Sequence, residues 1–455
     1  MDLGTSKIAL TVAKVDKENV QVLYYDETPS EGIHYSCVFN PGKASECVSR
    51  ALKQAEDELK IKILQVVIGL PRYGVRQEKA PGQLERTQPG SCITQEEVDT
   101  LKNLAMEDFP LEDDTREKVF EAVAQSFSTE DLIRMPERDI VGAISRSLEG
   151  NFTIFIGRKT DVNNLEAVFQ RAGIAVARNF FTPDVTADAV LTREERENGV
   201  ALIDLGAGVS SVTIYQGGIL RHYGAIPFGG RSITADIQYE CAFNESLAEN
   251  IKLAFGACQP EKLLSMSEKI IQISNDEDGS NRQLSVKYLS EIITAREREI
   301  FSALLYEIQR SGYAERLRNG VVFTGGASQL ANCTNLFKEM SGYDVRVAFP
   351  RQKHFVAESC PNILDTTATS SVGLLLRARK DDHLNCIDNP SEPVKEEEEP
   401  VDLKGTVFGD TGNETIKEKK PARKAAAAKR PKVTFLKKFT DSVLGLYDNV
   451  NETAE

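Results

Sequence analysis

Three glycine-rich turns at the ends of apolar strand patterns constrain this sequence more than any other feature. Glycines let a backbone approach a phosphate closely, and the successive N–H groups of such a turn form an anion-binding nest. Any one of these turns is ordinary, but three of them in this order predict a nucleotide site. The turns are Asp2-Leu3-Gly4-Thr5-Ser6-Lys7, Asp204-Leu205-Gly206-Ala207-Gly208-Val209-Ser210-Ser211 and Thr324-Gly325-Gly326-Ala327-Ser328.

The residue types within the turns indicate how a nucleotide would be held. An aspartate stands at the start of each of the first two turns, and Mg²⁺ prefers carboxylate, water and phosphate oxygens. Two such hairpins facing each other would clamp a triphosphate from both sides, with Asp2 and Asp204 holding Mg²⁺ through its water shell. The third turn opens a helical pattern, where a nucleotide sugar or phosphate can lie near the helix N-terminus.

Alternating strand and helix patterns around the turns predict an α/β fold. A segment of different character interrupts them at about 76–160, and Thr94 and Glu97 predict a capping box for a helix at about 95–107. This segment is expected to form a small α+β subdomain. The predicted strands are Ile8–Val15, Asn19–Tyr25, Gln65–Leu70, Val119–Ser126, Phe152–Gly157, Gly199–Asp204, Ser211–Tyr215 and Val321–Thr324, and the predicted helices are Lys43–Leu59, about 161–172, and Leu289–Arg310.

Composition limits the classes of protein that remain. The 455 residues suffice for about two to four domains, and the formal net charge of −14 argues against nucleic acid as a partner. Eight cysteines without a CxxC pair, and only four histidines, predict reduced thiols in a cytoplasm-like compartment and no zinc site. The chain starts directly at a glycine turn that normally follows a buried strand, so we expect further residues to precede Met1.

The C-terminal region changes character after Lys380. Residues 381–431 are rich in Glu, Lys, Pro and Ala and are expected to form a disordered linker, and residues 417–438 carry ten Lys or Arg and one Glu. At 100° per residue, the apolar side chains of 432–455 gather on one face of a helix. A basic, amphipathic helix of this kind is expected to lie in the headgroup plane of anionic lipids. The predicted membrane-facing residues are Phe435, Leu436, Phe439, Val443, Leu446 and Tyr447.

The order of the three turns resembles the actin, Hsp70 and sugar-kinase superfamily, and further motifs resemble the FtsA family of bacterial cell-division proteins. The segment at about 76–160 stands where that family carries its own subdomain. The motifs that carry the resemblance are the first turn, the hairpin from Gly217-Gly218 to Gly229-Gly230, Glu249-Asn250-Ile251-Lys252, Ile292-Ile293-Thr294-Ala295-Arg296 and the C-terminal linker and helix.

The resemblance implies an actin-like two-lobed fold with ribonuclease H-like subdomains, an inserted α+β subdomain and a disordered tail. The implied parts are the first lobe (1–75, 161–198 and the closing helix 361–380), the inserted subdomain (76–160), the second lobe with the nucleotide motifs (199–360), the linker (381–431) and the membrane-targeting helix (432–455).

The resemblance also implies a cofactor, partners and a location. ATP with Mg²⁺ is expected as the cofactor, and the expected partners are the tail of the tubulin-like protein FtsZ, further copies of this chain in protofilaments, anionic inner-membrane lipids and other division proteins. The protein is expected on the cytoplasmic side of the membrane at the division site. The implied nucleotide residues are Asp2, Gly4, Thr5, Ser6, Lys7, Asp204, Gly206, Ala207, Gly208, Val209, Ser210, Glu249, Lys252, Gly325, Gly326, Ala327 and Ser328.

Other readings of the same sequence stay open. The sequence departs from the family where Ala207 replaces a glycine, and Val209, Ser210 and Ser211 stand where many relatives have Thr and Asp. Without that carboxylate any ATP hydrolysis is expected to be weak. The alternatives are a small-molecule kinase of the same superfamily, for which no acceptor motif is found, and a pilus-assembly adaptor of the PilM type. An Hsp70-like chaperone would need a folded domain after residue 380, where the sequence is too polar.

Overall fold

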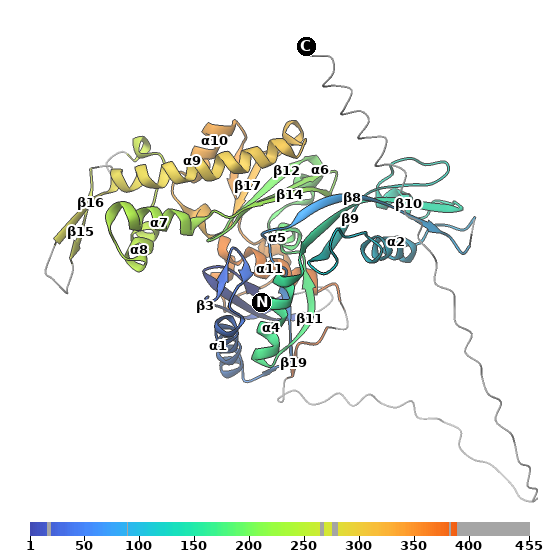
Figure 1. The fold of residues 1–455 in the computed structure, drawn as a ribbon, viewed down its shortest axis with the longest axis horizontal. Coiled ribbons are helices and arrows are strands. Elements are labelled where there is room, and N and C mark those ends of the chain that lie inside the picture. Colours follow the sequence, from blue (N-terminus) through green and yellow to red (C-terminus); the bar gives the residue numbers. More distant parts are fainter. Residues whose placement is uncertain (16–19, 89, 264–267, 275–280, 382–383, 389–455) are drawn as a thin grey trace, which may run out of the picture.

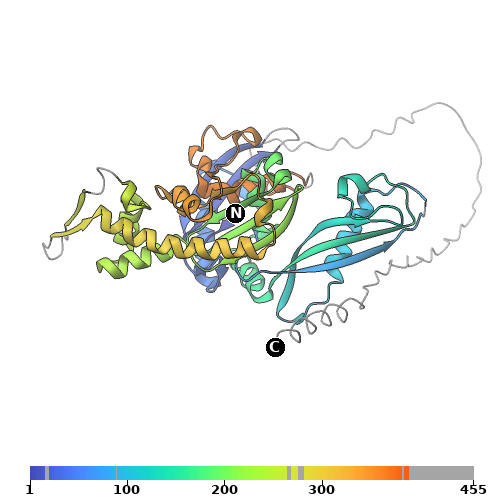
Figure 2. The same ribbon diagram turned by 90° about the horizontal axis from the view of Figure 1, so that it is seen from above.

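The computed structural model of the protein describes residues 1–15, 20–88, 90–263, 268–274, 281–381 and 384–388. Two lobes lie one above the other, and a smaller sheet projects from one end of the molecule (Figure 1). Seen from above, a hairpin of the second lobe, β15 (Ile270–Ser274) and β16 (Asn281–Ser285), occupies the opposite end (Figure 2).

The first lobe is built on a three-stranded and a two-stranded sheet, covered by helices. Its elements are β1 (Asp2–Leu3), β2 (Lys7–Val15), β3 (Val20–Pro29), β7 (Gln65–Gly69), β11 (Ala175–Phe180), α1 (Pro41–Leu59), α4 (Lys159–Ala172), α5 (Thr182–Val190), α6 (Arg193–Asn198) and α11 (Thr369–Ala378), with the short strands β4 (Ile33–His34), β5 (Cys37–Val38) and β6 (Lys62–Ile63). The strands β1, β2 and β3 are antiparallel, and β7 and β11 are parallel. The Met1 ammonium donates to the Val67 carbonyl at 2.7 Å, so β1 lies beside β7.

The second lobe has a five-stranded sheet in the order β14-β13-β12-β17-β18. Its elements are β12 (Val200–Leu205), β13 (Ser210–Gln216), β14 (Ile219–Ile226), β17 (Val321–Thr324), β18 (Val345–Val347), α7 (Gly230–Cys241), α8 (Glu245–Phe255), α9 (Val286–Arg310) and α10 (Cys333–Ser341). Three antiparallel strands are followed by two parallel ones, and the first lobe has the same two groups as separate sheets, β1-β2-β3 and β7-β11. The central strand β12 is buried along its whole length, as its continuous apolar run predicts.

Two helices, α5 and α11, pack against each other between the two sheets (Figure 1). Gly373 makes their contact possible, because a Cβ on this residue would lie 2.1 Å from the carbonyl oxygen of Val185. The close approach fixes α11 against β2 and β7 of the first lobe, while α5 reaches β13 of the second. The start of α11 is thereby placed where the two lobes meet.

The segment between β7 and α4 forms a separate sheet in the order β8-β10-β9. The capping box predicted from Thr94 and Glu97 is confirmed at the start of the helix that covers it. Its elements are β8 (Arg76–Glu85), α2 (Gln95–Glu107), β9 (Glu117–Ser128), α3 (Glu137–Ile140) and β10 (Ser147–Arg158), and their buried apolar side chains form a cluster of their own.

Two boundaries between parts of the chain differ from those predicted from the sequence. Val356 exchanges backbone hydrogen bonds with Val20 and Val22, so the chain has returned to the first lobe before residue 361. The folded part also extends beyond residue 380, because β19 (Ile387–Asp388) pairs with β6 and Ile387 packs on the first-lobe core. Residues 384–388 therefore belong to the folded first lobe, although the sequence assigned them to the linker expected from residue 381.

Candidate functional site

The first two glycine turns have the same geometry. The N–H of Gly4 donates to the Lys7 carbonyl at 2.9 Å, and the N–H of Gly206 donates to the Val209 carbonyl at 3.0 Å. A Cβ on Gly4 or Gly206 would lie 2.9 Å or 2.6 Å from the same carbonyl oxygen. Only glycine therefore allows either hairpin to turn so tightly.

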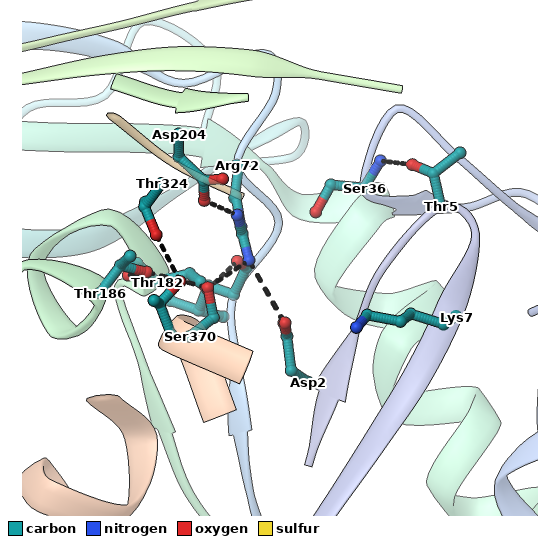
Figure 3. Close-up of polar contacts among 12 residues, drawn as sticks. Asp2, Thr5, Lys7, Ser36, Arg72, Thr182, Thr186, Asp204, Thr324 and Ser370 are labelled. Atoms are coloured by element: carbon teal, nitrogen blue, oxygen red, sulfur yellow. Dashed lines mark hydrogen bonds and ion pairs between the residues drawn. The ribbon is translucent and has the colours of Figure 1, made fainter. Parts of the chain in front are cut away.

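The two hairpins face each other across the boundary between the lobes, as the sequence predicts. A Cβ on Gly208 would lie 2.8 Å from both Oγ1 and Cγ2 of Thr5, so the second turn touches the first. The Thr5 hydroxyl accepts a hydrogen bond from the Ser36 N–H at 3.1 Å, which ties the first turn to the loop after β4 (Figure 3).

The third turn lies against the second. Gly325 has φ +86°, and a Cβ there would lie 2.4 Å from Asp204 Oδ1, so both conformation and space require glycine. The helix predicted directly after this turn is instead one turn of 3-10 helix, Gly326–Gln329, and α10 starts only at Cys333. The reason is local: Ser328 donates its hydroxyl to the Gly325 carbonyl at 2.6 Å, closing a short turn.

Lys252 and Glu249, both on α8, approach the turns from the second lobe. Lys252 is buried, and its ammonium donates to the Gly230 carbonyl at 3.0 Å, to Thr234 Oγ1 at 2.8 Å and to Glu249 Oε2 at 2.7 Å. Gly230 in turn donates its N–H to the Gly206 carbonyl at 2.9 Å. A Cβ on Gly230 would lie 3.5 Å from both Lys252 Nζ and the Cβ of Ala327, so the second turn, the third turn and α8 converge at Gly230.

Three of the remaining predicted residues differ in how they are paired. Lys7 forms an ion pair with Glu27, which also accepts from Thr367 Oγ1 at 3.1 Å, so its ammonium already has a partner. Ser6 is exposed and its carbonyl accepts from the Ser30 N–H at 3.0 Å. Ser210 is fully buried, and in the described part of the chain its hydroxyl has no hydrogen-bond partner.

Sequence reasoning missed Arg72, which lies at the centre of the site. Its guanidinium forms an ion pair with Asp204, lies 3.4 Å from both carboxylate oxygens of Asp2 and donates to Ser370 Oγ at 2.8 Å (Figure 3). Burial raises the pKa of Asp204, and the guanidinium opposes this effect. The position of Arg72 in the sequence could have indicated this role. Arg72 follows the carboxyl end of the strand β7, and ligands of α/β sheets bind at the carboxyl ends of strands.

The arrangement of Asp2, Arg72 and Asp204 does not fit a magnesium ion held by the two carboxylates. An ion held through its water shell, as the sequence predicts here, needs room between the carboxylates for near-octahedral oxygen ligands at about 2.0–2.1 Å from the ion. Here a guanidinium already lies between the carboxylates that the sequence assigns to the ion. Among the residues that the structure describes, no group of three or more His, Cys, Asp or Glu side chains could hold a metal ion.

The predicted membrane residues lie outside the described part of the chain. These are Phe435, Leu436, Phe439, Val443, Leu446 and Tyr447, together with most of the expected linker. Within the ranges that the structure does describe, no helix has the length and apolar character needed to cross a bilayer.

A cavity of about 520 Å³ opens away from the glycine turns, where β9 approaches the first lobe. Its walls include Gln125, Arg138, Arg196 and His354, and no residue of the three turns lines it. It is therefore separate from the candidate nucleotide site.

Comparison with known proteins gives consistent results in sequence and in structure. The family model described as "Cell division protein FtsA" matches residues 201–369. The cell division protein FtsA of Neisseria meningitidis is 28% identical over 385 residues, which cover 84% of this chain and 89% of that protein. FtsA of Escherichia coli is 26% identical over 395 residues, covering 85% and 90%.

Two solved structures share the fold. The PilM-PilN type IV pilus biogenesis complex aligns with a TM-score of 0.55 at 15% identity, covering 84% of this chain and 98% of that one. MreB5 of Spiroplasma citri bound to ADP aligns with a TM-score of 0.50 at 11% identity, covering 83% and 96%. At these identities the likeness concerns the fold alone, which is actin-like.

Proposed function

This chain belongs to the FtsA family of cell division proteins, and from that premise we propose that it binds ATP where its three glycine turns meet. One observation carries the proposal: three turns far apart in the sequence converge, with Gly208 against Thr5 and Gly325 against Asp204. Backbone N–H groups at such turns suit phosphate oxygens. The ADP bound to MreB5, which shares the fold, supports an adenine nucleotide.

The nucleotide site serves an adaptor in bacterial division. In this proposal the chain polymerises at the cytoplasmic membrane in the manner of actin, anchors the FtsZ ring there through the FtsZ tail, and helps to assemble the septal machinery. The projecting sheet β8-β10-β9 mediates self-contact or recruits later division proteins. Its own apolar cluster supports a unit that can make such contacts without disturbing the nucleotide site.

Attachment to the membrane is assigned to the C-terminal helix predicted over 432–455. The apolar face that includes Phe435, Phe439 and Leu446 would enter the headgroup region of the bilayer. The preceding basic residues would add on the order of 1 kcal/mol each on an anionic surface. In this proposal the two contributions together hold the chain on the cytoplasmic side of the membrane as a peripheral protein.

Binding of ATP is tested with two substitutions at one glycine. A Cβ on Gly326 would meet only Cγ2 of Thr367 at 3.5 Å, an ordinary contact, so Gly326→Ala should fold and bind normally. Gly326→Asp places a carboxylate against the nucleotide oxygens and should abolish binding. Both variants and the wild type are compared by the ATP-dependent rise in melting temperature. A wild type without any such rise would refute the proposal.

A pilus-assembly adaptor is the second candidate, favoured by the fold shared with PilM of the PilM-PilN complex. The sequence relatives are division proteins and cover most of the chain, so they favour division. A fluorescent fusion discriminates between the two functions. Rings at mid-cell in dividing cells are expected, and foci that never coincide with the division site would contradict the proposal.

A further inference from the structure

Arg72 lies between the two carboxylates that the sequence assigns to a magnesium ion. The guanidinium forms an ion pair with Asp204 and reaches both carboxylate oxygens of Asp2 at 3.4 Å (Figure 3). The side chains of Arg72, Asp2 and Asp204 are only 15%, 16% and 10% exposed. Water and salt screen such a group less than they screen charges on the surface.

Both lobes hold Arg72 in this position. Its neighbour Leu70 donates its N–H to the Phe180 carbonyl at 2.8 Å, which fixes the backbone beside β11. Tyr223, on β14 of the second lobe, donates its hydroxyl to the carbonyl of Arg72. The guanidinium itself donates to Ser370 Oγ on α11 at 2.8 Å. Moving Arg72 away from the carboxylates would therefore break contacts from several elements at once.

The charges of these three side chains determine whether the site attracts or repels the phosphates of a nucleotide. Asp2 and Asp204 together carry two negative charges, which would repel a triphosphate at short range if they were unpaired. A divalent cation relieves such repulsion, and so does a guanidinium. The planar guanidinium of an arginine donates hydrogen bonds to carboxylate and to phosphate oxygens with the same geometry. It is therefore suited to a position between the aspartate carboxylates and the phosphates of a nucleotide.

We propose that Arg72 takes the place of the divalent cation between Asp2 and Asp204, so that the chain binds adenine nucleotide with little dependence on Mg²⁺. This inference rests on the nucleotide site proposed above. Arg72 acts here by neutralising and positioning the two carboxylates. Without its charge, Mg²⁺ has to supply the neutralisation, and nucleotide binding becomes dependent on the ion.

The experiment measures the Kd of a fluorescent ATP analogue for the full chain in excess Mg²⁺ and in excess EDTA. Removing the ion should change the Kd of the wild type by no more than about threefold, and that of Arg72→Gln by on the order of tenfold or more. Glutamine removes the charge but can still donate to Ser370. Arg76→Gln is the matched control, because Arg76 pairs with Glu117 at 2.9 Å and not with the aspartates.

A second readout uses no nucleotide. Mg²⁺ alone should raise the melting temperature of Arg72→Gln, whose carboxylate pair is then open to the ion, and should leave the wild type unchanged. Arg72→Lys, which keeps one positive charge, should behave as the wild type does.

The outcomes separate this inference from the proposed function. If EDTA weakens binding to the wild type by about tenfold or more, the inference is overturned while the nucleotide site stands. If no form of the protein binds the analogue in either buffer, the nucleotide site itself is refuted. The wild-type comparison decides the question even if Arg72→Gln does not fold.

Discussion

Replacing Glu297 by glutamine should stabilise the folded protein at neutral and alkaline pH, by an amount that grows with pH. Glu297 lies on α9 with 1% of its surface exposed, and among the described residues its Oε2 has no hydrogen-bond partner. Burial raises the pKa of its carboxyl from the ordinary 4.5 to about 8, and the positive charge of Lys252 opposes the shift. A neutral amide of the same size avoids the cost of ionising a group in this position.

The sign and size of the effect follow from the two pKa values. In the unfolded chain the carboxyl ionises near pH 4.5, whereas in the folded protein it keeps its proton until about pH 8. Its contribution to the free energy of unfolding is therefore fully present below pH 4.5 and is lost as the pH rises to 8. At 1.36 kcal/mol per pKa unit, the difference between 8 and 4.5 sets an upper limit of about 5 kcal/mol.

Urea denaturation at about pH 5 and about pH 8 measures this difference directly. Between these two conditions the gap in unfolding free energy between Glu297→Gln and the wild type should widen by about 3 kcal/mol. Glu299→Gln is the matched control, since the Glu299 side chain is 69% exposed and its substitution should show no such widening. If the gap for Glu297→Gln were the same at both pH values, the carboxyl would not be held neutral by burial and the reasoning would fail.

Three further predictions concern other parts of the molecule. Arg86→Ala removes the buried partner of Glu97 and should lower the stability of the projecting sheet by about 3–5 kcal/mol. Limited proteolysis within 76–160 should therefore accelerate, while ATP binding is retained. Loss of ATP binding would show that the sheet and the nucleotide site are not separable. Burial lowers the pKa of His222 to about 4, below its ordinary 6.5, so unfolding free energy should decline by up to about 3 kcal/mol as the pH falls between these values. His222→Gln should flatten this decline in acid denaturation curves, and an unchanged curve would contradict the assignment. Phe439→Glu should release the chain from anionic vesicles in sedimentation nearly as well as truncation after Lys432 does; a truncated chain that still pelleted would require another anchor.

The sequence determined several local elements of this protein correctly. The capping box of Thr94 and Glu97 depends on residues three apart, and the strand pattern before Asp204 depends on six consecutive residues, so both were predictable. The glycine turns at Gly4 and Gly206 were predictable for the same reason. The helix expected after Gly325 was wrong in type, because a hydrogen bond from Ser328 decides between two short helical turns that sequence patterns do not separate.

The placement of those elements was decided only by the tertiary structure. The order of the three turns along the chain predicted a shared site, but the contact of Gly208 with Thr5 depends on two sheets that pack through α5 and α11. The pairing of β19 with β6 joins residues more than three hundred positions apart, and no local pattern records it.

Arg72 shows most clearly where the sequence stops being informative. Its neighbours in the chain place it after a strand, and this much can be read from the sequence. Its partners Asp2, Asp204 and Ser370 come from β1, β12 and α11, and they meet the guanidinium only when both lobes are assembled. The pairing of a buried charge depends on which distant groups surround it, and this is why the sequence predicted a cation between the two aspartates while the structure places an arginine there.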